Sequence, residues 1–164
     1  MSTPPLTPLA AAVLDVGSPE RVLDLECGDG EAALFLSREF PSARVRGVDR
    51  SEQAIRRARA RVGLDPEGRV AFKVGGPGSL PFPDDHFDLL TIVDAAPAPA
   101  EAARVLRAGG HLVVARTHGA VAVGGVLRWR LARRGFDRVH AGAAGDGSFA
   151  VFRFTAGWPH TASV

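Results

Sequence analysis

The stretch VLDLECGDG, residues 22–30, decides the fold of this chain, and the run RVRGVD, residues 44–49, follows it. Val22 to Leu25 predicts a strand that breaks into a glycine turn, and Glu31 to Phe40 predicts the helix that comes next. Backbone N–H groups of such a turn, together with the helix N-terminus, can face a nucleotide-like ligand. Asp49, at the tip of the second strand, can accept both hydroxyls of a ribose. The two features predict an adenosine-containing cofactor at the carboxyl ends of parallel strands.

Two cofactors fit this turn. Residues 28–33 satisfy the G-x-G-x-x-A pattern of dinucleotide sites, with Asp49 near the expected distance. For S-adenosylmethionine (SAM), the relevant pattern is Asp24-x-Glu26-x-Gly28-x-Gly30. Asp24 would order the turn and approach the cationic methionine end of SAM, directly or through water. The turn alone therefore leaves both cofactors open.

Four separated blocks resemble the class I SAM-dependent methyltransferases, particularly the type that acts on small molecules. They are VLDLECGDG (22–30), VRGVDRSEQAIRRAR (45–59), VGGPGSLPFPDDHFDLLTIVDA (74–95) and ARVLRAGGHLVVA (103–115). The resemblance implies an α/β fold, a single Rossmann-like doubly wound sheet of about seven strands in the order 3-2-1-4-5-7-6, with the last strand antiparallel. It also implies SAM as cofactor and S-adenosylhomocysteine (SAH) as product.

Length and composition agree with one such domain over residues 1–164. Its core is expected at about residues 20–154, preceded by a short helix at 6–16 and followed by a loosely attached tail at 155–164. The chain has 164 residues, 46% of them hydrophobic, and a net charge of +2. Cys27 is the single cysteine, which excludes a disulfide framework, and the N-terminus lacks the pattern of a secretion signal. We therefore expect a cytoplasmic protein. Its arginines are dispersed rather than gathered as a nucleic-acid footprint.

Periodicity and turn residues predict the remaining elements. We expect helices at 51–62, 100–107 and 126–134, and strands at 43–48, 70–74, 87–93, 111–115, 136–141 and 149–154.

The candidate cofactor-binding residues come from the strand ends of this frame. They are Asp24, Glu26, Cys27, Gly28, Gly30, Asp49, Arg50, Gly76, Pro77 and Asp94. Glu26 departs from the family pattern, in which the first glycine of the turn stands here; its carboxylate would pair with the ammonium or sulfonium of SAM, or would fill space. The turn tolerates Glu26 if the backbone there is not at positive φ. Gly76 stands where relatives usually place an aspartate that accepts a hydrogen bond from the adenine amino group. Cys27 is expected to serve in packing.

Asp94 and His118 are the candidate catalytic residues. Asp94 follows the strand at 87–93 and His118 follows the strand at 111–115, so both can reach an acceptor hydroxyl or amine; the alternatives are a turn-capping aspartate and an exposed loop histidine. The segments 94–99 and 116–125 are short, which predicts an open acceptor site. A large substrate, a second subunit or loss of catalysis would each account for it. No metal site is expected, since the histidines show no ligand spacing.

Three functions remain for this chain. The first is a SAM-dependent methyltransferase that acts on an oxygen or nitrogen of a small molecule, such as a specialised metabolite. The second is a SAM- or SAH-binding protein that does not methylate, as a partner subunit or in another cofactor-assisted reaction. The third is an NAD-dependent enzyme, disfavoured by the blocks at 74–95 and 103–115. We expect no membrane partner and, without an N-P-P-Y-like stretch after residue 93, no methylation of nucleic-acid bases. Apolar residues near Trp129 favour a homodimer.

Overall fold

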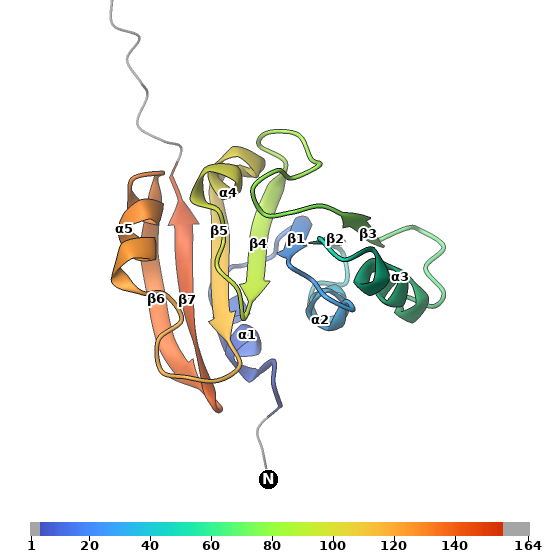
Figure 1. The fold of residues 1–164 in the computed structure, drawn as a ribbon, viewed down its shortest axis with the longest axis horizontal. Helices are drawn as coiled ribbons and strands as arrows, with labels where there is room; N and C mark the ends of the chain where they lie inside the picture. Colours follow the sequence, from blue (N-terminus) through green and yellow to red (C-terminus); the bar gives the residue numbers. More distant parts are fainter. Residues whose placement is uncertain (1–3, 156–164) are drawn as a thin grey trace, which may run out of the picture.

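The computed structural model describes residues 4–155 of the chain as an open α/β sheet with helices on both faces (Figure 1). The helices are α1 (Thr7–Ala12), α2 (Glu31–Glu39), α3 (Glu52–Arg61), α4 (Pro99–Val105) and α5 (Gly125–Ala132), and a 3₁₀ turn, η1 (Val13–Asp15), follows α1. The strands are β1 (Arg21–Leu25), β2 (Arg44–Asp49), β3 (Val70–Val74), β4 (Phe87–Val93), β5 (Leu106–Arg116), β6 (Phe136–Ala144) and β7 (Gly147–Phe154). The predicted tail lies outside the described residues except for Thr155.

The sheet has the order β3-β2-β1-β4-β5-β7-β6. Neighbouring strands from β3 to β5 are parallel, whereas β7 runs antiparallel to both β5 and β6. The predicted fold class and strand order are therefore confirmed. In Figure 1, β4 and β5 point downward, so their carboxyl ends lie at the lower edge of the sheet, and the parallel strands β1, β2 and β3 end along the same edge.

Two hydrophobic clusters cover the two faces of the sheet. The alternation of side chains along β1 shows the division, because Val22 belongs to one cluster while Leu23 and Leu25 belong to the other. The Val22 side is covered by α1, α2 and α3, and the Leu23 side by α4 and α5. Burial on both faces explains why β4 reads as a continuous apolar run.

Most predicted elements are confirmed, and β3 and β4 have the expected bounds. The predicted helix at 51–62 is α3, and Ser51 caps it, since its hydroxyl accepts a hydrogen bond from the Ala54 N–H at 3.1 Å. The predicted single helix at 6–16 was wrong in its second half. Its last turn tightens into η1, and the left-handed Gly17, at φ 70°, follows.

β5 begins at Leu106, five residues before the predicted start at 111, because α4 ends at Val105 and the chain pairs at once with β4. The register of this pair shifts between Phe87 and Leu89, and the glycine pair at 109–110 absorbs the shift. A Cβ on Gly110 would lie 3.0 Å from the Asp88 carbonyl oxygen, so the close approach of the two strands requires glycine there.

Candidate functional site

The predicted site residues come together at the lower edge of the sheet, where β1, β2 and β4 end. Asp24 is the fourth residue of β1 and is fully buried beside Thr91 of β4, whose hydroxyl donates to Asp24 Oδ1 at 2.7 Å. Burial raises the pKa of Asp24 to about 7; the Thr91 hydrogen bond lowers it, and the charge of Asp49 raises it further. Near neutral pH this carboxyl group is poised between its two protonation states, and a cation bound beside it would favour ionisation.

Asp49 joins the glycine turn to the start of α3. Its Oδ2 accepts a hydrogen bond from the Gly28 N–H, and its Oδ1 accepts one from the Ser51 N–H, both at 2.9 Å. The two bonds fix the orientation of the carboxylate, while each oxygen keeps a lone pair for a further donor. Paired hydroxyls of a ribose are donors of the required kind.

The two glycines of the turn have different roles. Gly28, at φ 54°, faces open space, because a Cβ there would have no atom of the protein within 4 Å apart from its chain neighbours. Gly30, at φ 89°, packs inward, where a Cβ would lie 2.9 Å from the Phe72 ring, and its N–H donates to the Cys27 carbonyl at 2.9 Å. The N–H of Gly30 is therefore used within the turn, and packing accounts for this glycine.

Cys27 lies within the turn as a buried thiol. Its N–H donates to the Val48 carbonyl of β2 at 2.9 Å, which ties the turn to the neighbouring strand. Burial, followed by the charges of Asp24, Asp49 and Glu26, raises the pKa of the thiol far above its usual range. The sulfur is thus protonated and not a nucleophile, in agreement with the predicted packing role.

Glu26 has a backbone conformation that is unfavourable for a residue with a side chain. Its φ is 53°, in the left-handed region where a side chain is strained, so the condition under which the turn was expected to tolerate Glu26 is not met. Only 18% of the side chain is exposed, and Oε1 lies 3.4 Å from Nε of Arg50. The contact connects the end of β1 with the end of β2.

Arg50 continues from this ion pair toward the loop after β3. A Cβ on Gly76 would lie 3.6 Å from Cγ of Arg50, so the arginine stem rests against the loop. Gly76 and Ser79 form an isolated antiparallel bridge, and Pro77 between them is half-buried. The predicted residues Glu26, Arg50, Gly76 and Pro77 therefore line the strand ends in succession.

Asp94 follows β4 and is held by the end of β5. At φ 58° it turns its carboxylate toward Thr117, whose N–H donates to Oδ1 at 2.8 Å and whose hydroxyl donates to Oδ2 at 2.7 Å. The Thr117 hydroxyl oxygen also lies 3.1 Å from Nδ1 of His118. Since the hydroxyl proton is engaged by the carboxylate, His118 must carry a proton on Nδ1 to complete the chain. Nε2 of a neutral His118 is then left with a lone pair.

Thr117 is the residue of this hydrogen-bonded series that the sequence did not predict. It stands directly before His118, and a hydroxyl between two candidate residues was the available signal. Its partner Asp94 is 23 residues away in the sequence, so only the parallel pairing of β4 and β5 brings the two together.

Residues 22–110, more than half of the chain, match the family model described as a methyltransferase domain. The chain belongs to the class I SAM-dependent methyltransferase family. This membership decides against the NAD-dependent interpretation of the glycine turn.

The relatives of this chain carry the names of different methyltransferases. It is 38% identical over 103 residues to the ubiquinone/menaquinone biosynthesis C-methyltransferase UbiE of Geobacter sulfurreducens, covering 57% of this chain and 40% of that protein. It is 32% identical over 121 residues to the 27-O-demethylrifamycin SV methyltransferase of Amycolatopsis mediterranei, covering 69% of this chain and 44% of that protein. The chain thus spans less than half the length of either relative.

A solved SAM-dependent methyltransferase from Aquifex aeolicus has the same fold. It superposes with a TM-score of 0.73 at 18% identity, covering 91% of this chain and 90% of the other.

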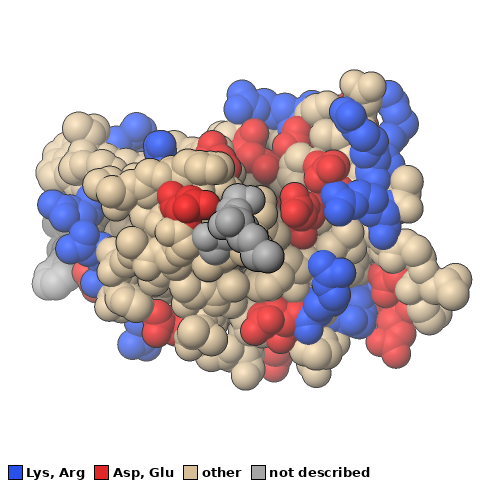
Figure 2. Space-filling model, turned by 90° about the horizontal axis from the view of Figure 1, so that it is seen from below, with Lys and Arg blue, Asp and Glu red and all other residues tan. Residues whose placement is uncertain are grey.

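Acidic side chains gather on the face that holds the candidate site. Figure 2 views the molecule from below, toward the carboxyl ends of β4 and β5; red atoms lie near the middle of this face and also at its lower right, and blue atoms lie toward both sides. The strand ends contribute the carboxylates of Asp24, Glu26, Asp49 and Asp94. Such an edge favours a ligand with positive charge.

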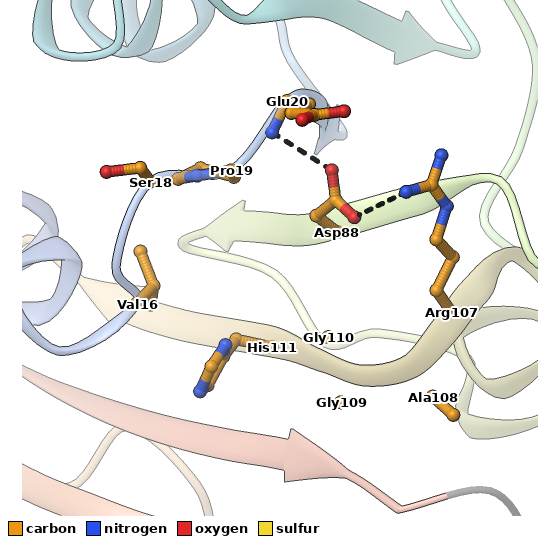
Figure 3. Close-up of a pocket in the computed structure, with 10 residues that line it drawn as sticks. All are labelled: Val16, Ser18, Pro19, Glu20, Asp88, Arg107, Ala108, Gly109, Gly110 and His111. Carbon is orange, nitrogen blue, oxygen red and sulfur yellow. Dashed lines mark hydrogen bonds and ion pairs between the residues drawn. The ribbon is translucent and has the colours of Figure 1, made fainter.

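The pocket in Figure 3 lies at the opposite edge, where β1 and β4 begin, and has a volume of about 390 Å³. Asp88 organises it: Oδ2 accepts from the N–H groups of Glu20 and Arg21, both at 2.9 Å, and Oδ1 lies 3.1 Å from Nη1 of Arg107. The three contacts bind the starts of β1, β4 and β5 together. None of the predicted site residues lines this pocket, so we assign it a structural role.

Among residues 4–155, no helix has the length and apolar character needed to cross a membrane.

Proposed function

We propose that this protein transfers a methyl group from SAM to an oxygen or nitrogen of a small molecule. The observation that carries the proposal is that the glycine turn, Asp49 and the chain Asp94–Thr117–His118 share one edge of the sheet. The first two provide the chemistry of a cofactor site, and the third provides a base for an acceptor that must lose a proton. The rifamycin methyltransferase, by its name, is a relative that acts on such an oxygen.

The residues present fit SAM. The space over Gly28 is open to a ligand, and the Asp49 carboxylate can accept the ribose hydroxyls. Asp24, near the end of β1, would be a counter-charge for the cationic methionine end. Arg50, Gly76 and Pro77 would lie along the adenine side. When bound, SAM would supply an electrophilic methyl carbon on a sulfur that is already a good leaving group.

His118 would act as the general base on the acceptor. Its Nδ1 is committed to Thr117, so Nε2 is the nitrogen that would take the acceptor's proton. Asp94 accepts both hydrogen bonds that Thr117 offers, and it would therefore position His118 through Thr117 instead of touching the acceptor. This proposal gives different roles to Asp94 and His118, the two candidate catalytic residues.

The acceptor site is open to a second chain. Asp94 and His118 are exposed, and Trp129 and Val126 of α5 expose 60% and 75% of their surface. We propose that a second copy or another subunit completes the wall around the small-molecule acceptor, and that neither a membrane nor a nucleic acid is the partner. Light scattering on the purified protein would reveal a homodimer.

Titration calorimetry with SAM, SAH and NAD tests the cofactor assignment. Micromolar binding of SAM and SAH without NAD supports it, and Asp49→Ala should weaken both affinities, whereas the exposed Asp29→Asn should leave them unchanged. Failure of the wild type and of Glu26→Gly to bind either compound would overturn it.

A second candidate function is a SAM- or SAH-binding protein that does not methylate. The ion pair between Glu26 and Arg50 favours it, because the pair connects strand ends at the place where a cofactor would lie. A screen of hydroxyl and amine acceptors with radiolabelled SAM separates the two functions. Labelled product that decreases in His118→Gln supports methyl transfer, and tight SAM binding with no product across the screen supports the second function.

A further inference from the structure

Glu26 is strained, largely buried and charged at the same position. A residue other than glycine at φ 53° persists only where its surroundings hold it, and such residues concentrate at functional sites. Burial of 82% of the side chain removes the carboxylate from most of its water, as only 18% is exposed. A glycine at this position would remove both the backbone strain and the cost of burying a charge. The presence of a carboxylate here therefore requires an explanation.

Arg50 neutralises this carboxylate only in part. The two charged groups are 3.4 Å apart, but 71% of the Arg50 side chain is exposed, so solvent screens the cation more strongly than the anion. Two further carboxyl groups act on the same turn, namely Asp49, which accepts a hydrogen bond from the Gly28 N–H, and Asp24 at the end of β1. The charges of all three acids raise the pKa of Cys27, which places their combined field on the turn.

We propose that Glu26 is a specificity-determining residue that makes this site prefer SAM to SAH by charge. SAM carries an ammonium, a sulfonium and a carboxylate, and its net charge is +1. SAH has a neutral sulfide in place of the sulfonium and a net charge of zero. The two compounds are otherwise alike in shape and hydrogen-bonding groups, so an ionised carboxylate in the cofactor turn attracts the positively charged donor more than it attracts the neutral product.

The proposal rests on the proposed function, since it requires that the turn binds SAM. It adds a consequence for turnover, because a site that holds SAH weakly releases its product readily. It also gives Arg50 a definite effect. Arg50 competes with SAM for the same carboxylate, so the arginine limits the preference that Glu26 creates.

The experiment is titration calorimetry of the full chain with SAM and with SAH, read as the ratio of the two dissociation constants. Glu26→Gln keeps the size of the side chain and removes its charge; we expect the preference for SAM to fall about tenfold, equivalent to about 1.4 kcal/mol. Arg50→Gln frees the carboxylate and should raise the preference. Added salt should reduce it in the wild type.

Asp29→Asn is the matched control. Asp29 lies in the same turn, but 54% of its side chain is exposed and it pairs with Arg61 of α3 at 3.0 Å. Its removal should leave the ratio unchanged. If Glu26→Gln does not fold, Glu26→Gly provides the same charge removal without the left-handed strain.

The possible results distinguish the charge preference of Glu26 from the cofactor assignment. Binding of both compounds by the Glu26 variants with the wild-type ratio would overturn the charge preference and leave the cofactor assignment intact. Binding of neither compound by the wild type and by Glu26→Gly would overturn the cofactor assignment, and this proposal with it. A lowered ratio in the Glu26 variants, with Asp29→Asn unchanged, supports it.

Discussion

Replacing Asp24 by asparagine should stabilise the protein above neutral pH and have little effect in acid. The pKa of Asp24 rises from 3.8 to about 7 on folding, chiefly because the carboxyl group is buried. Below pH 3.8 both the folded and the unfolded states hold the proton. Between the two pKa values only the unfolded state releases it, so stability falls as pH rises, and above about pH 7 the loss is complete.

The magnitude follows from the shift. Each pKa unit corresponds to about 1.4 kcal/mol, so the full cost of ionising Asp24 is about 4 kcal/mol. At pH 5 part of that cost is already present, and about 3 kcal/mol remains to be lost between pH 5 and pH 8. Asparagine does not ionise and its Oδ1 can still accept the Thr91 hydroxyl, so the variant avoids this loss.

Urea denaturation followed by circular dichroism at pH 5 and pH 8 measures the effect. The difference in unfolding free energy between Asp24→Asn and the wild type should grow by about 3 kcal/mol over this interval, while other titrating groups cancel between the two proteins. Thr91→Val is a useful companion variant, since it removes the hydrogen bond that lowers the pKa of Asp24. It should lose more stability between pH 5 and pH 8 than the wild type does. A difference that stays constant from pH 5 to pH 8 would refute the reasoning.

Three further substitutions test the glycine turn and the contacts of Asp88 at the opposite edge of the sheet. Glu26→Gly should stabilise the fold by about 1 kcal/mol, because the left-handed strain disappears and the ion pair, whose Arg50 side chain is 71% exposed, contributes little; a lower melting temperature would contradict this. Gly30→Ala should destabilise by about 1–3 kcal/mol through the contact with Phe72, measured by urea denaturation; Gly28→Ala, with open space at its Cβ, is the control that should cost less. Asp88→Ala should lower the free energy of unfolding by about 2–4 kcal/mol, since two backbone N–H groups and Arg107 lose their acceptor. An unchanged denaturation midpoint would show that water replaces the Asp88 carboxylate as acceptor.

Local patterns were sufficient for most of the fold. Short-range rules predicted the strand ends at Leu25 and Asp49, the helix that follows Asp49 and the last two strands, because each depends on residues close in the chain. At the start of β5, where prediction failed, pairing between distant segments decided the outcome. The start of β5 at Leu106 depends on the partner strand β4 and could not be read from the glycine pair alone.

The candidate site divides in the same way. The sequence by itself determined which chemical groups are present at the strand ends, since Asp24, the glycine turn and Asp49 follow from one strand-turn-helix pattern and its neighbour. Tertiary structure alone decided what those groups do. It buried Asp24 beside Thr91 and so raised its pKa, set Glu26 at positive φ against Arg50, and engaged Asp94 with Thr117. Desolvation, ion pairing and hydrogen bonding across strands depend on residues that are adjacent in space and distant in the chain, and a local pattern carries no record of them.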